Sequence, residues 1–191
     1  MSVKHNLQGE TRGRLSIRPA VESDALAIAA IHVAARRAAY ANLVPAEYLQ
    51  ALDVTERSRH WGKTLREMSD NRVVLLAETD APVGFASYGP SRDLDRVGDA
   101  ELYSIYVSPA AFGLGAGTML VARGASERAA RGFITINLWV FERNVQARRF
   151  YERLGWKEEA TTKQTKVAGA WLSERRHSRH VLIDTPARRP A

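Results

Sequence analysis

Cysteine is absent from the 191 residues of this chain. The protein therefore contains no disulfide, no cysteine-ligated zinc or iron–sulfur centre and no thiol nucleophile, so any acyl transfer by it avoids a cysteinyl intermediate. The sequence also lacks an apolar run near the roughly 20 residues that a membrane span needs. The first residues, Met1–Asn6, lack the apolar region of a signal peptide. These absences predict a soluble, cytoplasmic protein.

Acidic residues are fewer than basic ones: 28 lysines and arginines face 21 aspartates and glutamates, which gives a net charge of +7. Such a balance suits a nucleic-acid-binding protein, an enzyme with a polyanionic cofactor, or simply a solvated surface. Several arginines lie near the ends of the chain, at Arg12, Arg14, Arg175, Arg176, Arg179, Arg188 and Arg189. No basic element carries interleaved aromatic residues, which weakens the nucleic-acid interpretation.

Length and composition predict one globular domain, because 45% of the residues are hydrophobic and 26% are charged. We expect this domain to span 14–184, between a disordered N-terminal tail at 1–13 and a C-terminal tail at 185–191. The five histidines suggest no metal site. His177 and His180 are three apart on an expected strand and so project to opposite faces.

Hydrophobic periodicity predicts a mixed α/β arrangement. Helices are expected at 23–40, 45–52, 53–68, 115–130 and 144–154. Strands are expected at 15–18, 73–78, 83–88, 100–107, 133–141, 157–167 and 173–183. Asp53 with Glu56 forms a plausible helix cap, and Thr79–Pro82 is typical of a hairpin turn. This order favours a largely antiparallel mixed sheet over a regularly alternating parallel one.

A glycine-rich turn lies between the strand at 100–107 and the helix that follows it. Gly113, Gly115 and Gly117 let the backbone approach a ligand closely, and the amides at the helix start favour an anion such as a pyrophosphate. A Walker loop would need lysine before Thr118, and a dinucleotide fingerprint would need a small residue there, although Glu142 is suitably spaced. The pyrophosphate loop of an acetyltransferase, or a helix entry without ligand, are the other interpretations.

Two blocks around this turn carry a family resemblance. Val107-Ser108-Pro109 precedes the glycines, and 144–156 reads Asn-Val-Gln-Ala-Arg-Arg-Phe-Tyr-Glu-Arg-Leu-Gly-Trp. Both resemble signatures of the GNAT superfamily of N-acetyltransferases. The first block resembles the signature Val-x-Pro followed by Arg/Gln-x-x-Gly-x-Gly/Ala. The second resembles the signature Asn-x-x-Ala-x-x-Phe-Tyr-x-x-Leu-Gly-Phe/Trp. The resemblance covers roughly 15–183. It implies the acetyl-CoA N-acyltransferase fold: α/β, with a mostly antiparallel six- or seven-stranded sheet, a splayed central strand pair and about four helices.

The same resemblance implies acetyl-CoA (coenzyme A) as cofactor. The residues it places against the cofactor are Ile105, Tyr106, Val107, Phe112, Gly113, Leu114, Gly115, Ala116, Gly117, Thr118 and Asn144. One of them departs from the signature, because Phe112 stands where the superfamily carries arginine or glutamine. Weaker cofactor binding is expected, unless Arg123, Arg148 or Arg149 supplies the missing charge, or Phe112 packs on the cofactor.

Similarity to the superfamily further implies direct transfer from acetyl-CoA to a primary amine of a small molecule or protein. Glu101 is the expected general base and Tyr151 the expected acid for the leaving thiolate. Trp139 occupies the other family base position and cannot take a proton. A non-catalytic CoA-sensing or basic nucleic-acid-binding module is the alternative.

The acceptor is the least defined part of the prediction. Tyr40 and Tyr103 are expected to line its site. Asp93, Asp95 and Asp99 either attract a cationic amine or form an ordinary solvated loop. Membrane and nucleic acid are not expected as partners, and a homodimer is compatible with these expectations.

Overall fold

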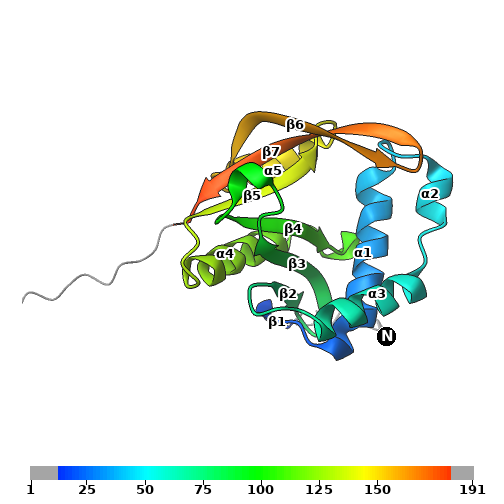
Figure 1. Ribbon diagram of the computed structural model, residues 1–191. Helices are drawn as coiled ribbons and strands as arrows, with labels where there is room; N and C mark the ends of the chain where they lie inside the picture. Colours follow the sequence, from blue (N-terminus) through cyan, green and yellow to red (C-terminus); the bar gives the residue numbers. More distant parts are fainter. Residues whose placement is uncertain (1–12, 182–191) are drawn as a thin grey trace, which may run out of the picture.

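The computed structural model describes residues 13–181, so the expected tails lie almost wholly outside the described residues. Seven strands form one sheet in the order β1-β2-β3-β4-β5-β7-β6 (Figure 1). Their bounds are β1 Ser16–Pro19, β2 Val73–Glu78, β3 Pro82–Pro90, β4 Ala100–Val107, β5 Thr135–Phe141, β6 Lys157–Val167 and β7 Ala170–His180. Every neighbouring pair is antiparallel except β4 and β5. The predicted mostly antiparallel α/β sheet is confirmed.

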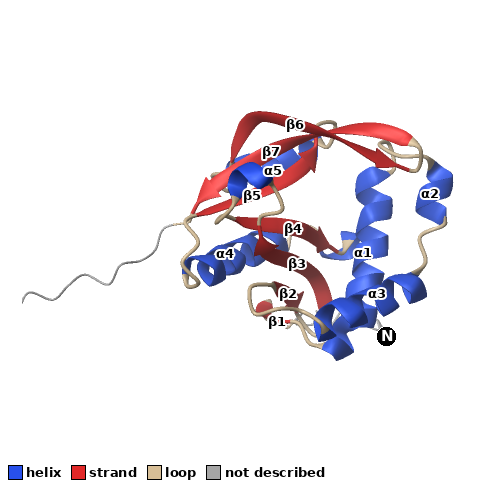
Figure 2. Ribbon diagram, viewed as in Figure 1, coloured by secondary structure: helices blue, strands red, loops and turns tan. Residues whose placement is uncertain are grey.

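Residues 13–181 form five α-helices around the sheet (Figure 2), one more than the resemblance implied. They are α1 Ala25–Tyr40, α2 Ala46–Gln50, α3 Val54–Arg66, α4 Ala116–Ala129 and α5 Val145–Arg153. The Asp53 carboxylate accepts from the Glu56 amide at 2.6 Å and caps α3, as its spacing predicts. Among residues 13–181, no helix combines the length and apolarity needed to cross a membrane.

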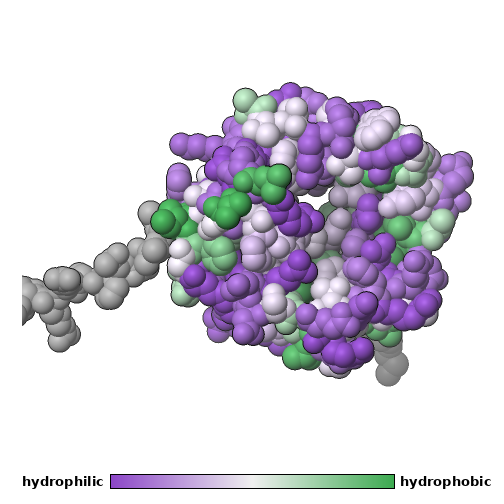
Figure 3. Space-filling model, in the orientation of Figure 1, coloured by the Kyte–Doolittle hydropathy of each residue, from purple (hydrophilic) through white to green (hydrophobic). Residues whose placement is uncertain are grey.

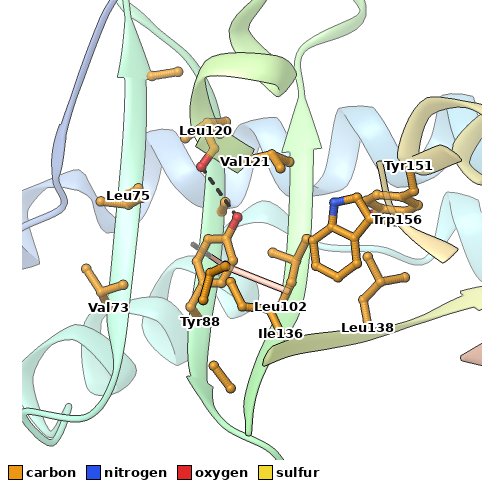
Figure 4. Close-up of a cluster of buried hydrophobic side chains, with 14 of the residues drawn as sticks. Val73, Leu75, Tyr88, Leu102, Leu120, Val121, Ile136, Leu138, Tyr151 and Trp156 are labelled. Carbon is orange, nitrogen blue, oxygen red and sulfur yellow. Dashed lines mark hydrogen bonds between the residues drawn. The ribbon is translucent and has the colours of Figure 1, made fainter. Parts of the chain in front are cut away.

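The sheet is covered on both faces because its inner strands alternate between two hydrophobic clusters. On β2, Leu75 and Ala77 join the cluster under α4 and α5, whereas Val74 and Leu76 join the cluster under α1 and α3. Figure 4 shows the first cluster, which extends from Leu75 through Tyr88 and Leu120 to Tyr151. A strand buried on both faces is continuously apolar, as β2 is.

The central strands β4 and β5 are splayed. Their parallel pairing covers only Ala100–Leu102 against Ile136–Leu138. On the other edge of β4, Ser104 pairs with Ser87 and Leu102 with Tyr88, so Tyr103 is an extra, unpaired residue. Such a bulge bends its strand and increases the local twist. Beyond Leu102, β4 follows β3 while β5 follows β7, which confirms the predicted splayed pair and opens a gap between them.

Candidate active site

A cleft of about 840 Å³ occupies this gap. Figure 3 shows the surface hollowed between the β6–β7 hairpin, β4 and α1. The predicted residues that line it are Tyr40, Tyr103, Ile105, Tyr106, Val107, Phe112, Gly113, Gly115, Ala116, Gly117, Thr118, Asn144 and Tyr151. Leu114 and Glu101 are outside its lining. The splay therefore brings together segments that are far apart in the sequence.

The glycine turn opens one end of the cleft. Gly113 and Gly115 have φ of 85° and 83°, a region that favours glycine. Gly115 begins α4 without any side-chain cap, so the amides of the first turn remain available. Free amides and the positive end of the helix dipole favour a diphosphate here. The residues present therefore fit the phosphate part of coenzyme A.

Phe112 is 56% exposed beside this turn and brings no charge. Two of the arginines expected to compensate are engaged elsewhere: Arg123 binds Glu127 at 2.9 Å, and Arg148 binds Glu158 at 2.7 Å. Instead, Arg153 lines the cleft from α5. Its spacing from Phe150 on one helix face is the signal that sequence reasoning overlooked.

Three of the four tyrosines that line the cleft, Tyr40, Tyr106 and Tyr151, come from three different elements. The Tyr40 and Tyr106 hydroxyl oxygens are 3.4 Å apart. Burial raises the pKa of Tyr151, and the neighbouring Tyr106 adds to the effect. Burial, again with Tyr106, also raises the pKa of Tyr40. Both groups therefore stay protonated at neutral pH and act as hydrogen-bond donors.

Glu101 is buried on β4 but turned away from the cleft. Its Oε2 accepts from the Arg92 backbone amide at 2.9 Å and from Arg92 Nε at 3.1 Å, and its Oε1 binds the same guanidinium. Tyr103 lines the cleft, but its hydroxyl donates to the Pro90 carbonyl at 2.6 Å. The Arg92 guanidinium lies over the Tyr103 ring in a cation–π contact. The roles expected for Glu101 and Tyr103 stay predictions.

Glu174 is the carboxylate that lines the cleft. It lies on β7 opposite Phe141, accepts from Thr165 Oγ1 at 2.6 Å and is 3.5 Å from Lys163 Nζ. Nothing in the local sequence distinguishes it from other strand glutamates. Only the β5–β7 register places it in the cleft.

The acidic loop before β4 is neutralised by arginines rather than open to a cationic amine. Arg176 is buried and reaches Asp93 at 3.2 Å and Asp95 at 2.7 Å. Arg96 pairs with Asp99 at 3.5 Å. Asp93 also accepts from the Trp139 indole at 3.0 Å, which fixes a residue that lines the cleft.

Within residues 13–181, one group of metal-type ligands is formed by side chains of α5, β6 and β7. Ligand atoms of Glu152, Glu158 and His177 are within 4.8 Å of one another. Arg148 and Arg175 both bond the Glu158 carboxylate, at 2.7 and 3.2 Å, so two guanidinium charges oppose a cation there. His177 is buried and His180 exposed, which agrees with their expected placement on opposite faces of the strand.

His32 lines the cleft from α1 in its neutral form. Burial lowers its pKa to about 3, and the charges of Arg57 and Arg36 act in the same direction. The Trp61 indole, which can only donate, donates to His32 Nδ1 at 3.2 Å. The ring proton is therefore on Nε2.

Acidification is expected to cost stability through His32. The unfolded side chain gains a proton near pH 6.5 whereas the folded one does not until about pH 3, so stability is present above pH 6.5 and falls below it. When the pH is lowered from 7 to 5, the unfolding free energy of the parent should fall. We expect that of His32→Gln to fall by about 2 kcal/mol less. Urea unfolding at both pH values measures this. The exposed His60, changed to Gln, is the control, and equal losses in the parent and His32→Gln would contradict the assignment.

Comparisons with known proteins agree with this geometry. Residues 25–156 match the Acetyltransferase (GNAT) family. The uncharacterized N-acetyltransferase YuaI of Bacillus subtilis is 32% identical over 161 residues, which cover 84% of this chain and 90% of that protein. The mycothiol acetyltransferase of Mycobacteroides abscessus is 39% identical over 90 residues, 46% of this chain and 30% of that one.

Solved structures give the same result for the fold. A ribosomal-protein-alanine N-acetyltransferase from Brucella melitensis has a TM-score of 0.66 and 27% identity, covering 86% of this chain and 99% of that one. The PaiA N-acetyltransferase from Thermoplasma acidophilum, solved with coenzyme A, has a TM-score of 0.65 at 18% identity, covering 84% and 98%. This chain belongs to the GNAT family of acetyltransferases.

Proposed function

We propose that this protein transfers the acetyl group of acetyl-CoA directly to a primary amine. The observation that carries the proposal is the single cleft that joins the uncapped start of α4, the free edge of β4 and the buried phenol of Tyr151. Two structures with this fold were solved with coenzyme A and with acetyl-CoA, respectively. The amines that its relatives act on differ, so the acceptor has to be argued from this chain.

The cofactor would be held mainly by backbone. The amides of Gly113 and of 115–118 would face the diphosphate, with Asn144 and Arg153 beside them. Ile105–Val107 have β3 on one edge only, because β5 has diverged after Leu102. That open edge can bond an extended amide-containing arm as an added strand would.

When bound, acetyl-CoA supplies a thioester: the amine nitrogen bonds to its carbonyl carbon as the carbon–sulfur bond breaks, and coenzyme A leaves. Tyr151 donates its phenolic proton to the departing sulfur. The attacking nitrogen must lose a proton, and we propose Glu174 as the receiving carboxylate because it lines the cleft. Glu101 would need Arg92 to move, or water to relay the proton.

Gly115→Val is expected to weaken acetyl-CoA binding about tenfold. A branched residue at φ 83° is strained by about 1–2 kcal/mol, and relief of that strain would turn the first amides of α4 away from the phosphates. Isothermal titration calorimetry measures the Kd. The matched control is Gly132→Val, which has the same φ of 83° and open space around it but lies outside the cleft. Equal effects of both variants on binding would contradict the proposed phosphate site.

The function is tested by thiol release from acetyl-CoA over a panel of amines. Acetyl-CoA should raise the melting temperature, whereas NAD and an oligonucleotide should not. Thiol release that depends on an added amine supports the enzyme. Stabilisation by acetyl-CoA with no release from any amine would instead favour the CoA-sensing alternative.

A further inference from the structure

Two residues on one face of α1, both of which line the cleft, carry a buried hydrogen-bond donor without a partner among residues 13–181. His32, Arg36 and Tyr40 recur every four residues, so they lie along one side of the helix, and all three line the cleft. Within the described part of the chain, His32 Nε2 and Arg36 Nε are both buried and have no partner. A buried donor without an acceptor is destabilising, and native structures contain few of them.

His32 is held so that its free atom must be a donor. Trp61 occupies Nδ1, and the ring stacks on Tyr106 with centroids 4.6 Å apart and an interplanar angle of 21°. A half-turn of the ring would keep the stacking but would move Nδ1 away from the Trp61 indole. His32 Nε2–H needs an acceptor that residues 13–181 do not provide.

Arg36 is held by aromatic rings rather than by acids. Its guanidinium lies 5.3 Å from the Tyr40 ring centroid and 5.7 Å from that of Tyr48. No carboxylate of residues 13–181 pairs with it, whereas the buried Arg176 contacts three. The charge of Arg36 reaches His32, where it helps to lower the histidine pKa. This part of the cleft is therefore cationic and lacks an anion.

We propose that the acceptor amine also carries a carboxylate, that is, an amino acid, and that Arg36 and His32 Nε2–H bind this carboxylate. The inference rests on the proposed acetyl transfer and names its substrate class. A carboxylate has two oxygens that accept hydrogen bonds, and a guanidinium can bind it through two of them. Glu174, the cleft's own carboxylate, is then left for the ammonium group of the same molecule.

The test compares free amino acids with their amides, which keep the amine and lose the negative charge. Thiol release is measured for the standard L-amino acids, β-alanine and 4-aminobutyrate, each beside its amide, with spermidine and an alanine-initiated peptide as further amines. We expect kcat/KM for the preferred amino acid to exceed that for its amide by about tenfold or more.

Arg36→Met should remove this preference mainly through KM, and Arg36→Lys should restore part of it. The matched control is Arg59→Met, an exposed arginine on α3 outside the cleft, which should keep the full ratio. Calorimetry with acetyl-CoA shows that each variant is folded, and Arg36→Met should keep the Kd within about twofold.

Several results would overturn the inference while the proposed transfer stands. One is an equal kcat/KM for amino acids and their amides. Another is a ratio of these kcat/KM values that Arg36→Met leaves unchanged. A third is thiol release with spermidine or the peptide but with no amino acid. An Arg36→Met variant that binds acetyl-CoA much more weakly would assign Arg36 to the cofactor and also overturn it. Absence of release from every amine would instead count against the proposed transfer, and the inference would fall with it.

Discussion

Replacement of Tyr151 with phenylalanine is expected to lower kcat about 100-fold and to leave the Kd for acetyl-CoA within about twofold. General acid catalysis by a positioned side chain contributes about 10²–10⁴ in rate, and the phenol is the group removed. The ring is 8% exposed and packs near Trp156 with centroids 5.8 Å apart, so phenylalanine keeps the packing. Steady-state thiol release gives kcat, and calorimetry gives the Kd.

The state of the phenol supports this expectation. Burial, with Tyr106 adding to it, raises the pKa of Tyr151, so the group stays protonated throughout the neutral range. Within residues 13–181 its hydroxyl makes no hydrogen bond, which leaves it free to donate to the departing sulfur. Because the acid must be protonated, its raised pKa moves any alkaline loss of activity to higher pH.

Tyr88→Phe is the matched control for Tyr151→Phe. Tyr88 is a buried phenol of the same hydrophobic cluster, its hydroxyl donates to the Leu120 carbonyl at 3.4 Å, and it lies outside the cleft. We expect kcat of this variant to remain near that of the parent. A Tyr151→Phe enzyme that retained kcat within about threefold would remove Tyr151 as the acid.

Much of the fold could be predicted because its signals are local. Asp53 caps α3 and Asn144 caps α5 through bonds to amides three residues ahead, so a short stretch of sequence contains the whole signal. Gly113 and Gly115 indicate a positive-φ backbone conformation that other residues rarely adopt. The splay, in contrast, came from the family resemblance, since the bulge at Tyr103 leaves no pattern in periodicity.

The chemistry of the cleft was only half predictable for a related reason. Tyr151 and the glycine turn belong to sequence blocks that carry the resemblance. The roles proposed for Glu174 and Arg36 depend instead on residues far away in the sequence. Glu174 lies opposite Phe141 in the β5–β7 ladder, and Arg36 lies over the ring of Tyr48 on another helix. Composition alone does not show whether an arginine has a carboxylate partner within the protein. An arginine with such a partner stabilises the fold, whereas one without it is available to bind a ligand.

Arg176 shows how strongly the partner matters. It counts toward the net charge of +7 near the end of the chain, yet it is 3% exposed and contacts Asp93, Asp95 and Glu159. The hydrogen bond to Asp95 is the main reason that its pKa is raised. Part of the apparent basic surplus is therefore internal, and it joins the acidic loop before β4 to the β6–β7 hairpin.

Arg176→Met is expected to lower the unfolding free energy by about 3 kcal/mol or more. Removing one partner of a buried ion pair leaves the other charges uncompensated, which typically costs about 3–5 kcal/mol. Asp93 would keep Trp139 at 3.0 Å, and Glu159 would keep Arg96 at 2.6 Å, so the loss falls toward the lower end. Chemical denaturation monitored by tryptophan fluorescence measures it.

The neighbouring Arg175 gives the matched control, because it lies on the same strand but is more exposed. Its side chain is 31% exposed and pairs with Glu142 and Glu158, so Arg175→Met should lower the unfolding free energy much less than Arg176→Met does. Salt should distinguish them as well: near 1 M ionic strength the Arg175 effect should disappear by screening, whereas most of the Arg176 effect should persist. Equal losses from both variants, or complete removal of the Arg176 effect by salt, would show that the Arg176 network behaves as surface pairs. In that case the Arg176 network would not fix the loop 91–99, and the hydrogen bond from Trp139 to Asp93 in this loop would not explain the position of Trp139.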